Sequence, residues 1–430
     1  MRGAASASET PAAPRPAVDG LADDVVAQIA RIGPCDVAVG VPTYNNASTI
    51  GAVGEAVRAA ADKHFRGLSV AVVNADTGSS DGTPPALAQA GVPCVLARSE
   101  APLHERAEVP FHGVPGRGDA LRTILGVAHR LGARVLVLLE ADVTTITDEW
   151  PERLSRPVRE DGADWVAAAY VRHRYDGTIT RLLLSPLLRA LYSRRLHQPI
   201  GGQQALSARL VEHLLVHPRW NWTGRDVTDV WIAGTALADG FAPWEVPLGP
   251  YRVHSATRSR DLPTMVAQSL GAVFTVMDRH EDLWLETRGS EPVPGYDDVP
   301  PPLTEPIEVD VERMVEAFRL GLRDLTTIWE HIMTGETLGD VLALDVADPA
   351  RFRFPDDLWA RVVYDFALGH HYGVVHREHL LRSLVPLYLG RTAAFIVTTR
   401  GRDAAATEAQ GEAVGAAFER QKPYLVERWR

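Results

Sequence analysis

The sequence is poor in cysteine, with only Cys35 and Cys94 among 430 residues. Two thiols build neither a disulfide framework nor a cysteine-based metal centre, and such sparing use is typical of a reducing compartment. An excess of basic residues is also missing, because the formal net charge is −11, which excludes a non-specific nucleic-acid binder. No run approaches the roughly 18 uncharged apolar residues of a membrane span, and residues 1–20 lack the apolar core of a signal peptide. We therefore expect a soluble, cytoplasmic protein that binds neither nucleic acid nor membranes.

The composition is that of a globular protein, with 46% hydrophobic and 23% charged residues. A chain of 430 residues holds about two or three domains' worth of structure. Residues 1–33 begin with an Ala-, Pro- and Ser-rich tail, and we expect them to form a disordered lead-in. Residues 34–286 alternate between apolar runs and helical patterns, residues 287–307 are a proline-rich linker, and residues 308–430 are almost wholly helical in pattern.

Apolar runs alternate with helical periodicity throughout residues 34–286, which is the pattern of a parallel sheet with helical crossovers. The expected strands are 36–42, 68–73, 92–97, 134–139, 165–171 and 244–246. One helix is expected to begin near residue 48, and further helices are expected over 120–131, 182–196, 226–238 and 262–285.

The run Arg134–Leu139 is too short for a helix and apolar enough for a fully buried strand. It ends at Glu140-Ala141-Asp142, where two carboxylates flank one small residue. Open α/β sheets bind ligands at the carboxyl ends of their strands. Carboxylates at this spacing can hold a divalent cation and, through it, a diphosphate. The plainer alternative is that Glu140 begins a solvated loop.

Three further polar loops are expected at the same edge of the sheet, namely Pro42–Asn46, Asp76–Thr83 and Gly116–Asp119. Asp76 follows a buried strand and can accept hydrogen bonds from a base or a ribose hydroxyl. Alternatively, its loop is an ordinary turn in which Asp81 or Thr83 caps the next helix. Arg117 lies between two glycines at a helix start, where it suits phosphate or base contacts or is part of a flexible turn. The convergence of four loops indicates a nucleotide site more strongly than any one of them.

In this order, the motifs resemble those of nucleotide-sugar-dependent glycosyltransferases of the GT-A fold. This resemblance is carried by Val41–Asn45, Asp76–Thr83, Gly116–Leu121 and Glu140–Asp142. The chain is similar more narrowly to the retaining mannosylglycerate, glucosylglycerate and glucosyl-3-phosphoglycerate synthases, through Gln198–Gly202, Gly224–Asp226, His254 and Leu387–Arg391. The resemblance covers residues 35–285 well and the rest more loosely. It implies an α/β fold of the GT-A type, with a Rossmann-like mixed sheet in a catalytic domain at 34–286 and a helical carboxyl-terminal region.

The resemblance also implies roles for individual residues. The donor nucleotide would be bound by Pro42, Thr43, Tyr44, Asn46, Asp76, Thr77, Arg117 and Ala141. A Mg²⁺ or Mn²⁺ ion would be bound by Asp142, His254 and Glu140. Catalysis would rest on Asp142 and on Asp226, which would face the transferring sugar. The acceptor would lie beside Gly201, Gly202 and Gln203. A guanidinium fork fits a carboxylate in two parallel hydrogen bonds, so further candidates for acceptor binding are Arg172, Arg174 and Arg252.

The sequence departs from the family pattern at three positions. Glu140 replaces the usual first aspartate of the acidic pair, which predicts a lost or lengthened metal contact. Asn46 and Gln203 stand where relatives often carry Glu, so base preference and acceptor or sugar specificity stay open. His254 taken alone has an ordinary structural interpretation as well, because the chain has 15 histidines.

The expected activity is transfer of glucose or mannose from a nucleoside diphosphate sugar to D-glycerate, or to a similar small hydroxy acid, by a homodimer. Retention of configuration is what the resemblance implies. One alternative keeps the fold and uses 3-phosphoglycerate or a secondary-metabolite acceptor. A nucleotidyltransferase and a non-catalytic nucleotide-binding protein are further alternatives. The first of these two is disfavoured because Pro42–Asn46 lacks a glycine-rich basic loop.

Overall fold

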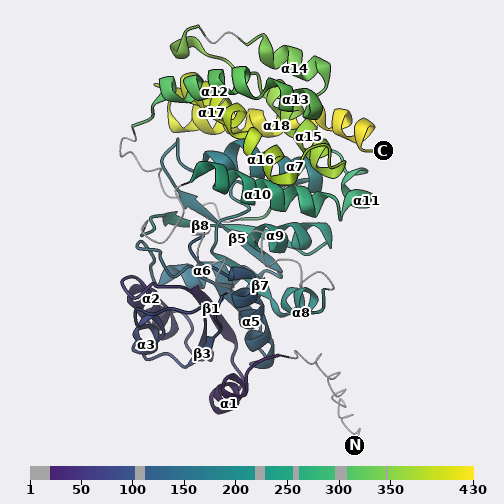
Figure 1. Ribbon diagram of the computed structural model, residues 1–430. Helices are drawn as coiled ribbons and strands as arrows, with labels where there is room; N and C mark the ends of the chain where they lie inside the picture. The colour runs from purple at the N-terminus through teal and green to yellow at the C-terminus, as the bar shows by residue number, and fades with distance from the viewer. Residues whose placement is uncertain (1–19, 102–111, 218–227, 255–260, 296–307, 345–346) are drawn as a thin grey trace, which may run out of the picture.

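The computed structural model describes residues 20–101, 112–217, 228–254, 261–295, 308–344 and 347–430. A sheet with its flanking helices forms one half of the molecule, and the carboxyl-terminal helices are stacked on it as the other half (Figure 1). The predicted α/β class with a helical carboxyl-terminal region is therefore confirmed.

The central sheet has seven strands in the order β3-β2-β1-β4-β7-β5-β8. Their bounds are β1 Val37–Thr43, β2 Val70–Asp76, β3 Cys94–Arg98, β4 Val135–Leu138, β5 Trp165–Val171, β7 Gln204–Ser207 and β8 Pro243–Pro250. β7 pairs antiparallel with both β4 and β5, while the other pairs in the sheet are parallel. The sheet is thus mixed, and β1 and β4 lie next to each other near its centre. Their carboxyl ends consequently meet at the same edge.

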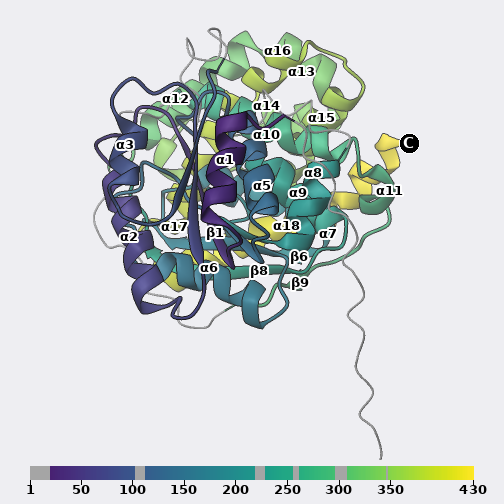
Figure 2. The ribbon, with the colours of Figure 1, turned by 90° about the horizontal axis from the view of Figure 1, so that it is seen from below.

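Helices cover both faces of the sheet (Figures 1 and 2). They are α1 Asp23–Ile32, α2 Ile50–Lys63, α3 Thr83–Ala88, α5 Arg117–Arg130, α6 Glu149–Glu160, α8 Ala208–Val216 and α9 Thr228–Ala238. One hydrophobic core joins α2 and α6 to the face of β1 that carries Val37 and Val39. The other core joins α5 to the opposite face, at Ala38. Gly40 allows the close approach of α5, because a Cβ there would lie 2.3 Å from Cγ2 of Ile124.

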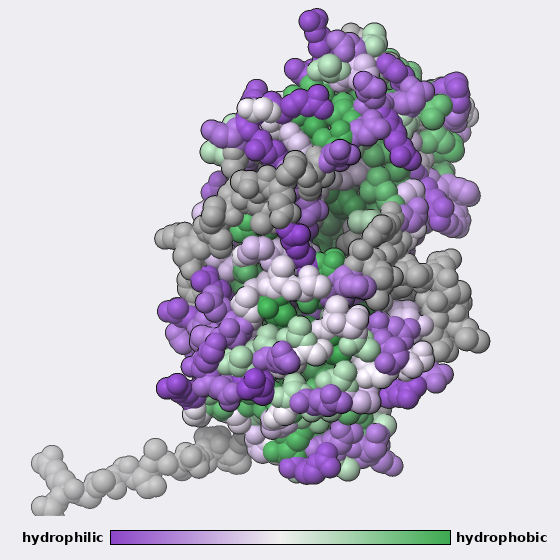
Figure 3. Space-filling model, turned by 90° about the vertical axis from the view of Figure 1, so that its left-hand side faces the viewer, coloured by the Kyte–Doolittle hydropathy of each residue, from purple (hydrophilic) through white to green (hydrophobic). Residues whose placement is uncertain are grey.

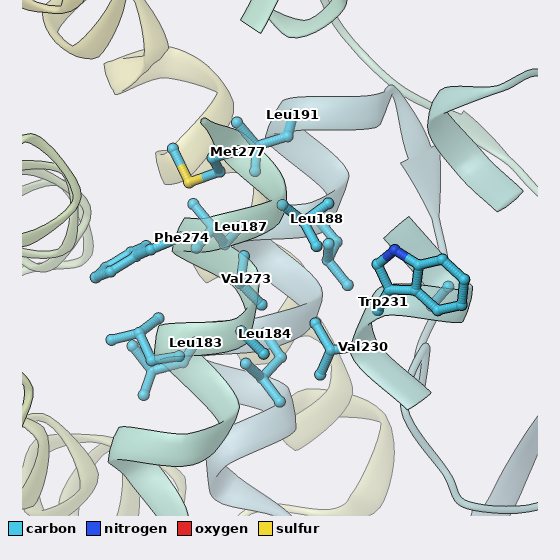
Figure 4. Packing of buried hydrophobic residues seen from close by; sticks show 14 of the residues in the cluster. Leu183, Leu184, Leu187, Leu188, Leu191, Val230, Trp231, Val273, Phe274 and Met277 are labelled. Carbon is cyan, nitrogen blue, oxygen red and sulfur yellow. The ribbon is translucent and has the colours of Figure 1, made fainter. Parts of the chain in front are cut away.

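The helices that follow link the two halves of the molecule. They are the π-helix η1 Thr180–Leu184, α7 Ser185–Tyr192, α10 Leu262–Met277 and α11 Glu281–Trp284. Leucines of η1 and α7 interdigitate with residues of α9 and α10 (Figure 4), and those labelled there are Leu183, Leu184, Leu187, Leu188, Leu191, Val230, Trp231, Val273, Phe274 and Met277. A helix was expected over 182–196, but α7 ends at Tyr192. The next residue, Ser193, takes a left-handed conformation with φ 58°, which stops the helix. A two-stranded sheet follows, made of β6 Arg194–Arg195 and β9 Glu291–Pro292.

The carboxyl-terminal half is wholly helical. Its elements are α12 Val311–Asp324, α13 Thr326–Ile332, α14 Gly335–Leu342, the 3-10 helix η4 Pro349–Arg351, α15 Asp356–His371, α16 Arg377–Ser383, α17 Val385–Thr399 and α18 Ala404–Trp429. The long α18 lies against α7 and α15. Arg189 of α7 is buried there and pairs with Glu412 and Glu419 of α18. The same hydrophobic core continues from α7 and α10 into this half.

The disordered lead-in expected at residues 1–33 is wrong for its last part. Residues 23–32 form α1, while residues 1–19 lie outside the described residues. Val25 is buried, and the side chain of Gln28 both donates to and accepts from the backbone of Leu96. The helix thus packs against β3, one of the two edge strands of the sheet. Of the expected linker 287–307, residues 291–292 form β9 and residues 296–307 are not described.

Within the described residues, one helical stretch is apolar and long enough to span a membrane by composition. It is Arg377–Thr399, which comprises α16 and α17 and has a mean hydropathy of 1.4 in its most apolar window. Since 78% of that window is buried inside the molecule, the stretch has the burial of a core helix.

Candidate functional site

The acidic pair after β4 lies where loops from three strands and the start of α5 meet. A hollow at this edge has a volume of about 10 Å³, room for about one water molecule. It is lined by Pro42, Asn46, His112, Gly113, Val114, Arg117, Glu140, Ala141 and Asp142. Six of these were expected from the sequence to bind the donor or the metal. The structure therefore brings together residues from three separate segments, and the fourth predicted loop, Asp76–Thr83, does not line the hollow.

Asp76 does not present a vacant carboxylate to this hollow. It is 1% exposed. One oxygen accepts from the amides of Gly78 and Ser79, at 3.1 and 2.9 Å. The other accepts from the hydroxyls of Thr43 and Ser79, at 2.9 and 2.5 Å. A carboxylate offers about four acceptor positions, and the protein's own donors occupy four here, so Asp76 holds the turn after β2. Its contact with a nucleoside stays a prediction.

The turns after β1 and β2 are joined by hydrogen bonds between side chains and backbone. Thr77, which is buried, donates its hydroxyl to the carbonyl of Thr43 at 3.2 Å. The amide of Asn46 donates to the Thr83 hydroxyl at 2.7 Å. Asn46 also accepts from the amide of Tyr44 through its side chain, at 2.9 Å. These bonds fix the loop that includes Tyr44 and Asn46, although neither Tyr44 nor Thr43 lines the hollow.

Arg117 is the first residue of α5 and is committed to a buried ion pair. Its Nε and Nη2 lie 3.0 and 3.2 Å from the two carboxylate oxygens of Asp229, near the start of α9. Both side chains are less than a tenth exposed. Gln204 of β7 donates to the same carboxylate at 3.1 Å and accepts from the indole of Trp165. Arg117 therefore lines the hollow, and the carboxylate of Asp229 neutralises its guanidinium.

Glu140 is turned towards the glycine loop expected to contact the acceptor. Its Oε2 accepts from the Tyr251 hydroxyl at 2.7 Å and from Nε2 of Gln203 at 3.3 Å. A Cβ added to Gly202, where φ is 80°, would lie 2.3 Å from Cδ of Glu140. The neighbouring Gly201 accepts from the Tyr170 hydroxyl through its carbonyl, at 2.7 Å. The loop 201–203 thus packs directly on Glu140.

The three candidate arginines lie in different surroundings. The guanidinium of Arg172 lies over the rings of Tyr170 and Tyr251, at 5.1 and 4.7 Å, and these rings are 4.3 Å apart. Arg172 also lines a separate cavity of about 820 Å³ between β5, β8 and α18. Arg174 instead donates to the carbonyl of Arg402, ahead of α18, so the structure does not bring it to the acidic pair. Arg252 is exposed, two residues before His254.

Asp142 and His254 are brought side by side. Val143 and Val253 form an antiparallel bridge, and the amide of His254 donates to the carbonyl of Asp142 at 2.8 Å. In an antiparallel pair, directly opposed residues point to the same face with their Cβ atoms about 5 Å apart. The carboxylate and the imidazole therefore leave the backbone together, although 111 positions separate them in the chain.

The pair Asp142 and His254 suits a divalent cation, because one contributes oxygen and the other nitrogen from the same face. Glu140 is the poorer third ligand, since its Oε2 is taken by Tyr251 and Gln203. Among the described residues, the cluster whose three metal-ligating side chains approach within 4.8 Å of one another lies elsewhere, at the carboxyl-terminal ends of α8 and α9. Asp142 and His254 are therefore candidates to hold a metal ion beside the hollow, and their role as ligands stays a prediction.

Asp226, expected to face the sugar, lies outside the described residues. Sequence reasoning also missed Asp229, Gln204, Tyr170 and Tyr251. The sequence held a signal for Asp229, because it lies three residues after Asp226 and near the start of the expected helix 226–238. The two tyrosines carried no signal, because only the tertiary fold places their hydroxyls near Glu140 and the loop 201–203.

No protein-family model and no curated protein sequence matches the chain. Among solved structures, it is similar to glucosyl-3-phosphoglycerate synthase from Mycobacterium tuberculosis in complex with Mn²⁺, UDP and glucosyl-3-phosphoglycerate. The sequence identity is 22%, the TM-score is 0.40, and the match covers 63% of this chain and 87% of that one. The same enzyme with Mg²⁺ and UDP matches at 22% identity over 60% and 83% of the two chains, with a TM-score of 0.39. With Mn²⁺, UDP-glucose and phosphoglyceric acid, it matches at 22% identity over 63% and 86%, with a TM-score of 0.38. The comparison returns the family that the motifs resemble, at a similarity too low to transfer the role of any residue.

Proposed function

We propose that the protein is a metal-dependent hexosyltransferase. It would move glucose or mannose from a nucleoside diphosphate sugar to D-glycerate or a similar small carboxylated acceptor. The observation that carries this proposal is the convergence on one hollow of Pro42, Asn46, Arg117, Glu140, Ala141 and Asp142. The sequence motifs predict this chemistry for the same six residues.

The chain's own groups suit a diphosphate at this edge. Asp142 and His254 would hold Mg²⁺ or Mn²⁺, and the bound cation would neutralise charge on the departing diphosphate. α5 begins beside the hollow at Arg117, and the free amides of a first helical turn favour an anion. Asp229 keeps Arg117 at that position through two hydrogen bonds. The hydroxyl of Thr49 fixes the acidic loop by donating to the carbonyl of Ala141 at 2.7 Å.

The acceptor would bind on the side of Glu140 that faces the glycine loop. Gly202 leaves room there for the carboxylate of Glu140, and Tyr251 orients that carboxylate. Arg172 carries a cation next to both tyrosines and would attract an acceptor carboxylate. Such positioning aligns the acceptor hydroxyl with the anomeric carbon. Two parts of the proposal, retention of configuration and the role of Asp226, are supported only by the family resemblance of the sequence motifs.

A nucleotide requires this hollow to widen, because ligand pockets measure roughly 300–1,000 Å³ and the hollow measures about 10 Å³. We therefore expect a nucleoside diphosphate with Mn²⁺ to raise the melting temperature. That result alone fits a non-catalytic binding protein equally well. The deciding experiment is a matrix of donors and acceptors.

UDP-glucose, GDP-glucose, ADP-glucose and GDP-mannose would each be incubated with D-glycerate, 3-phosphoglycerate or glycerol, with Mn²⁺ or Mg²⁺ or with a chelator. The proposal predicts a hexosylated hydroxy acid in the presence of the cation only, and no product from glycerol. If hexose were transferred to 3-phosphoglycerate and not to D-glycerate, 3-phosphoglycerate would replace D-glycerate as the acceptor in the proposal. Failure of every donor would overturn the proposal, as would consumption of a sugar phosphate with a nucleoside triphosphate instead.

A further inference from the structure

Two histidines and one aspartate gather at a place remote from the acidic pair. His213 lies in the last turn of α8, His217 follows that helix, and Asp239 follows the end of α9. One potential ligand atom from each residue lies within 4.8 Å of the others. Nε2 of His213 is already 2.7 Å from Oδ2 of Asp239. His217 directly follows the last residue of α8, four residues after His213, and the two imidazole rings lie 5.9 Å apart.

We propose that His213, His217 and Asp239 bind a divalent transition metal, with zinc as the best fit. Imidazole suits zinc, whereas Mg²⁺ and Ca²⁺ prefer oxygen ligands. Zinc takes four ligands in protein sites, and two histidines with one carboxylate supply three of them. Nδ1 of His280 lies 4.0 Å from the other oxygen of Asp239 and is a candidate for the fourth ligand. Water is the alternative.

The electrostatic surroundings favour a cation. Two helices end here, and the carboxyl-terminal end of a helix carries a partial negative charge. Asp239 adds a full negative charge at the same point. The nearest fixed cation on α8 is Arg209, one turn before His213, and Asp164 neutralises it through two hydrogen bonds from its guanidinium.

Aromatic neighbours orient the two imidazoles. The ring of His213 lies 5.0 Å from that of Phe241, and the ring of His217 lies 5.4 Å from that of Trp231. The two imidazoles are themselves 5.9 Å apart between ring centres. Such ring contacts restrict rotation of the two imidazoles, which favours metal binding.

The same chain contains a contrasting cluster of two histidines and one aspartate. His370 and His371 are adjacent on α15, and both approach Asp278. Nδ1 of His371 lies 2.8 Å from one carboxylate oxygen, and Nδ1 of His370 lies 3.5 Å from the other. Each imidazole therefore has its own oxygen, and the aspartate bridges them. This cluster is a matched control, with the same residue types and no shared ligand position.

The proposed metal would tie the end of α8 to the end of α9. α9 carries Asp229 at its start, and Asp229 holds Arg117 at the candidate active site. The metal would thus stabilise the scaffold without touching substrate. The site does not depend on the proposed transferase activity.

The test is titration of chelator-stripped protein with ZnCl₂, followed by calorimetry, metal analysis and melting temperature. Wild-type protein should bind one zinc ion at this site and melt at a higher temperature with it. The double variant H213A/H217A should bind that zinc at least about tenfold more weakly and lose the thermal shift. H370A/H371A should behave as wild type, and D142A should retain the site, which separates it from the candidate active site.

A spectroscopic readout on unmodified protein covers the case in which the double variant fails to fold. Co²⁺ in place of zinc should give the intense visible absorption of a tetrahedral site, and Asp239→Asn should weaken it. Absence of zinc binding by wild type, equal binding by H213A/H217A, or only the weak absorption of octahedral Co²⁺ would each overturn the proposal.

Discussion

Glu140 and Asp76 are carboxylates at the ends of β4 and β2, the two strands that flank β1, and their surroundings give them different tasks. Asp76 is enclosed by donors from its own turn and from Thr43. Glu140 is held by partners from two distant segments, Gln203 and Tyr251. The sequence predicts that both lie at the binding edge, because strand ends are recognisable from apolar runs. It does not predict which one is enclosed, because the donors depend on turn geometry and tertiary contacts.

The contact between Gly202 and Glu140 gives a stability prediction with an internal control. Gly249 has the same φ of 80° as Gly202, but a Cβ added to it would meet nothing within 4 Å. Gly249→Ala should therefore cost only the left-handed strain, about 1–2 kcal/mol of unfolding free energy. Gly202→Ala should cost about 1–3 kcal/mol more, because it collides with Glu140. Chemical denaturation of both variants measures the difference, and equal losses would mean that Glu140 moves away freely.

His197 and Glu245 provide a prediction of pH dependence. Nδ1 of His197 lies 2.7 Å from the carboxylate of Glu245, and that hydrogen bond raises the pKa of His197 from 6.5 to about 9. Because the pKa of His197 is raised in the folded state, protonated His197 stabilises the fold. This stabilisation is fully present below pH 6.5 and is lost as the pH rises towards 9.

The melting-temperature advantage of wild type over Glu245→Gln should accordingly be largest near pH 6 and shrink by about pH 9. The effect should be modest, because the His197 side chain is 61% exposed and solvent screens the pair. Melting curves across this pH range measure it. An advantage that does not change with pH would show that the ion pair contributes nothing, even if the hydrogen bonds of Glu245 to backbone amides still do.

At the scale of elements, the candidate site depends on how α5 and α9 are joined. Sequence periodicity predicts both helices, because their apolar faces repeat at helical spacing. β7 was not expected, since four residues of mixed polarity become a strand only when β4 and β5 flank them. α6 was not expected either, because Pro151 and Pro157 interrupt its pattern. Pro151 is tolerated because the amides of a first helical turn have no helical partner.

The ion pair between Arg117 and Asp229 is the joint between α5 and α9. Asp229→Asn leaves a buried guanidinium without its counter-charge, which should lower the unfolding free energy by about 3–5 kcal/mol. Asp62→Asn is the control, because Asp62 and Arg58 form an exposed pair with side chains 66% and 52% exposed. It should cost less than about 1 kcal/mol. Denaturation curves compare the two, and a small loss for Asp229→Asn would mean that Gln204 or water replaces the carboxylate.

At the scale of the whole molecule, one hydrophobic core runs from the sheet half into the carboxyl-terminal helices. The sequence predicts those helices but not their attachment, because the surfaces of α7 and α18 that meet are far apart in the chain. The buried Arg189 illustrates this, since a basic residue on a helix is usually solvated and here pairs with two glutamates of α18. The homodimer and the cytoplasmic location remain predictions, and light scattering on the purified protein tests the first.

The measurement that tests the account most directly is the rate of hexose transfer by Asp142→Ala with Mn²⁺ and D-glycerate. Asp282→Ala, at an exposed position on α11, is the matched control. If Asp142 and His254 hold the cation that stabilises the leaving diphosphate, Asp142→Ala should lose at least about 10²-fold in rate, while Asp282→Ala keeps the wild-type rate. Near-normal transfer by Asp142→Ala, with both variants folded, would contradict the account.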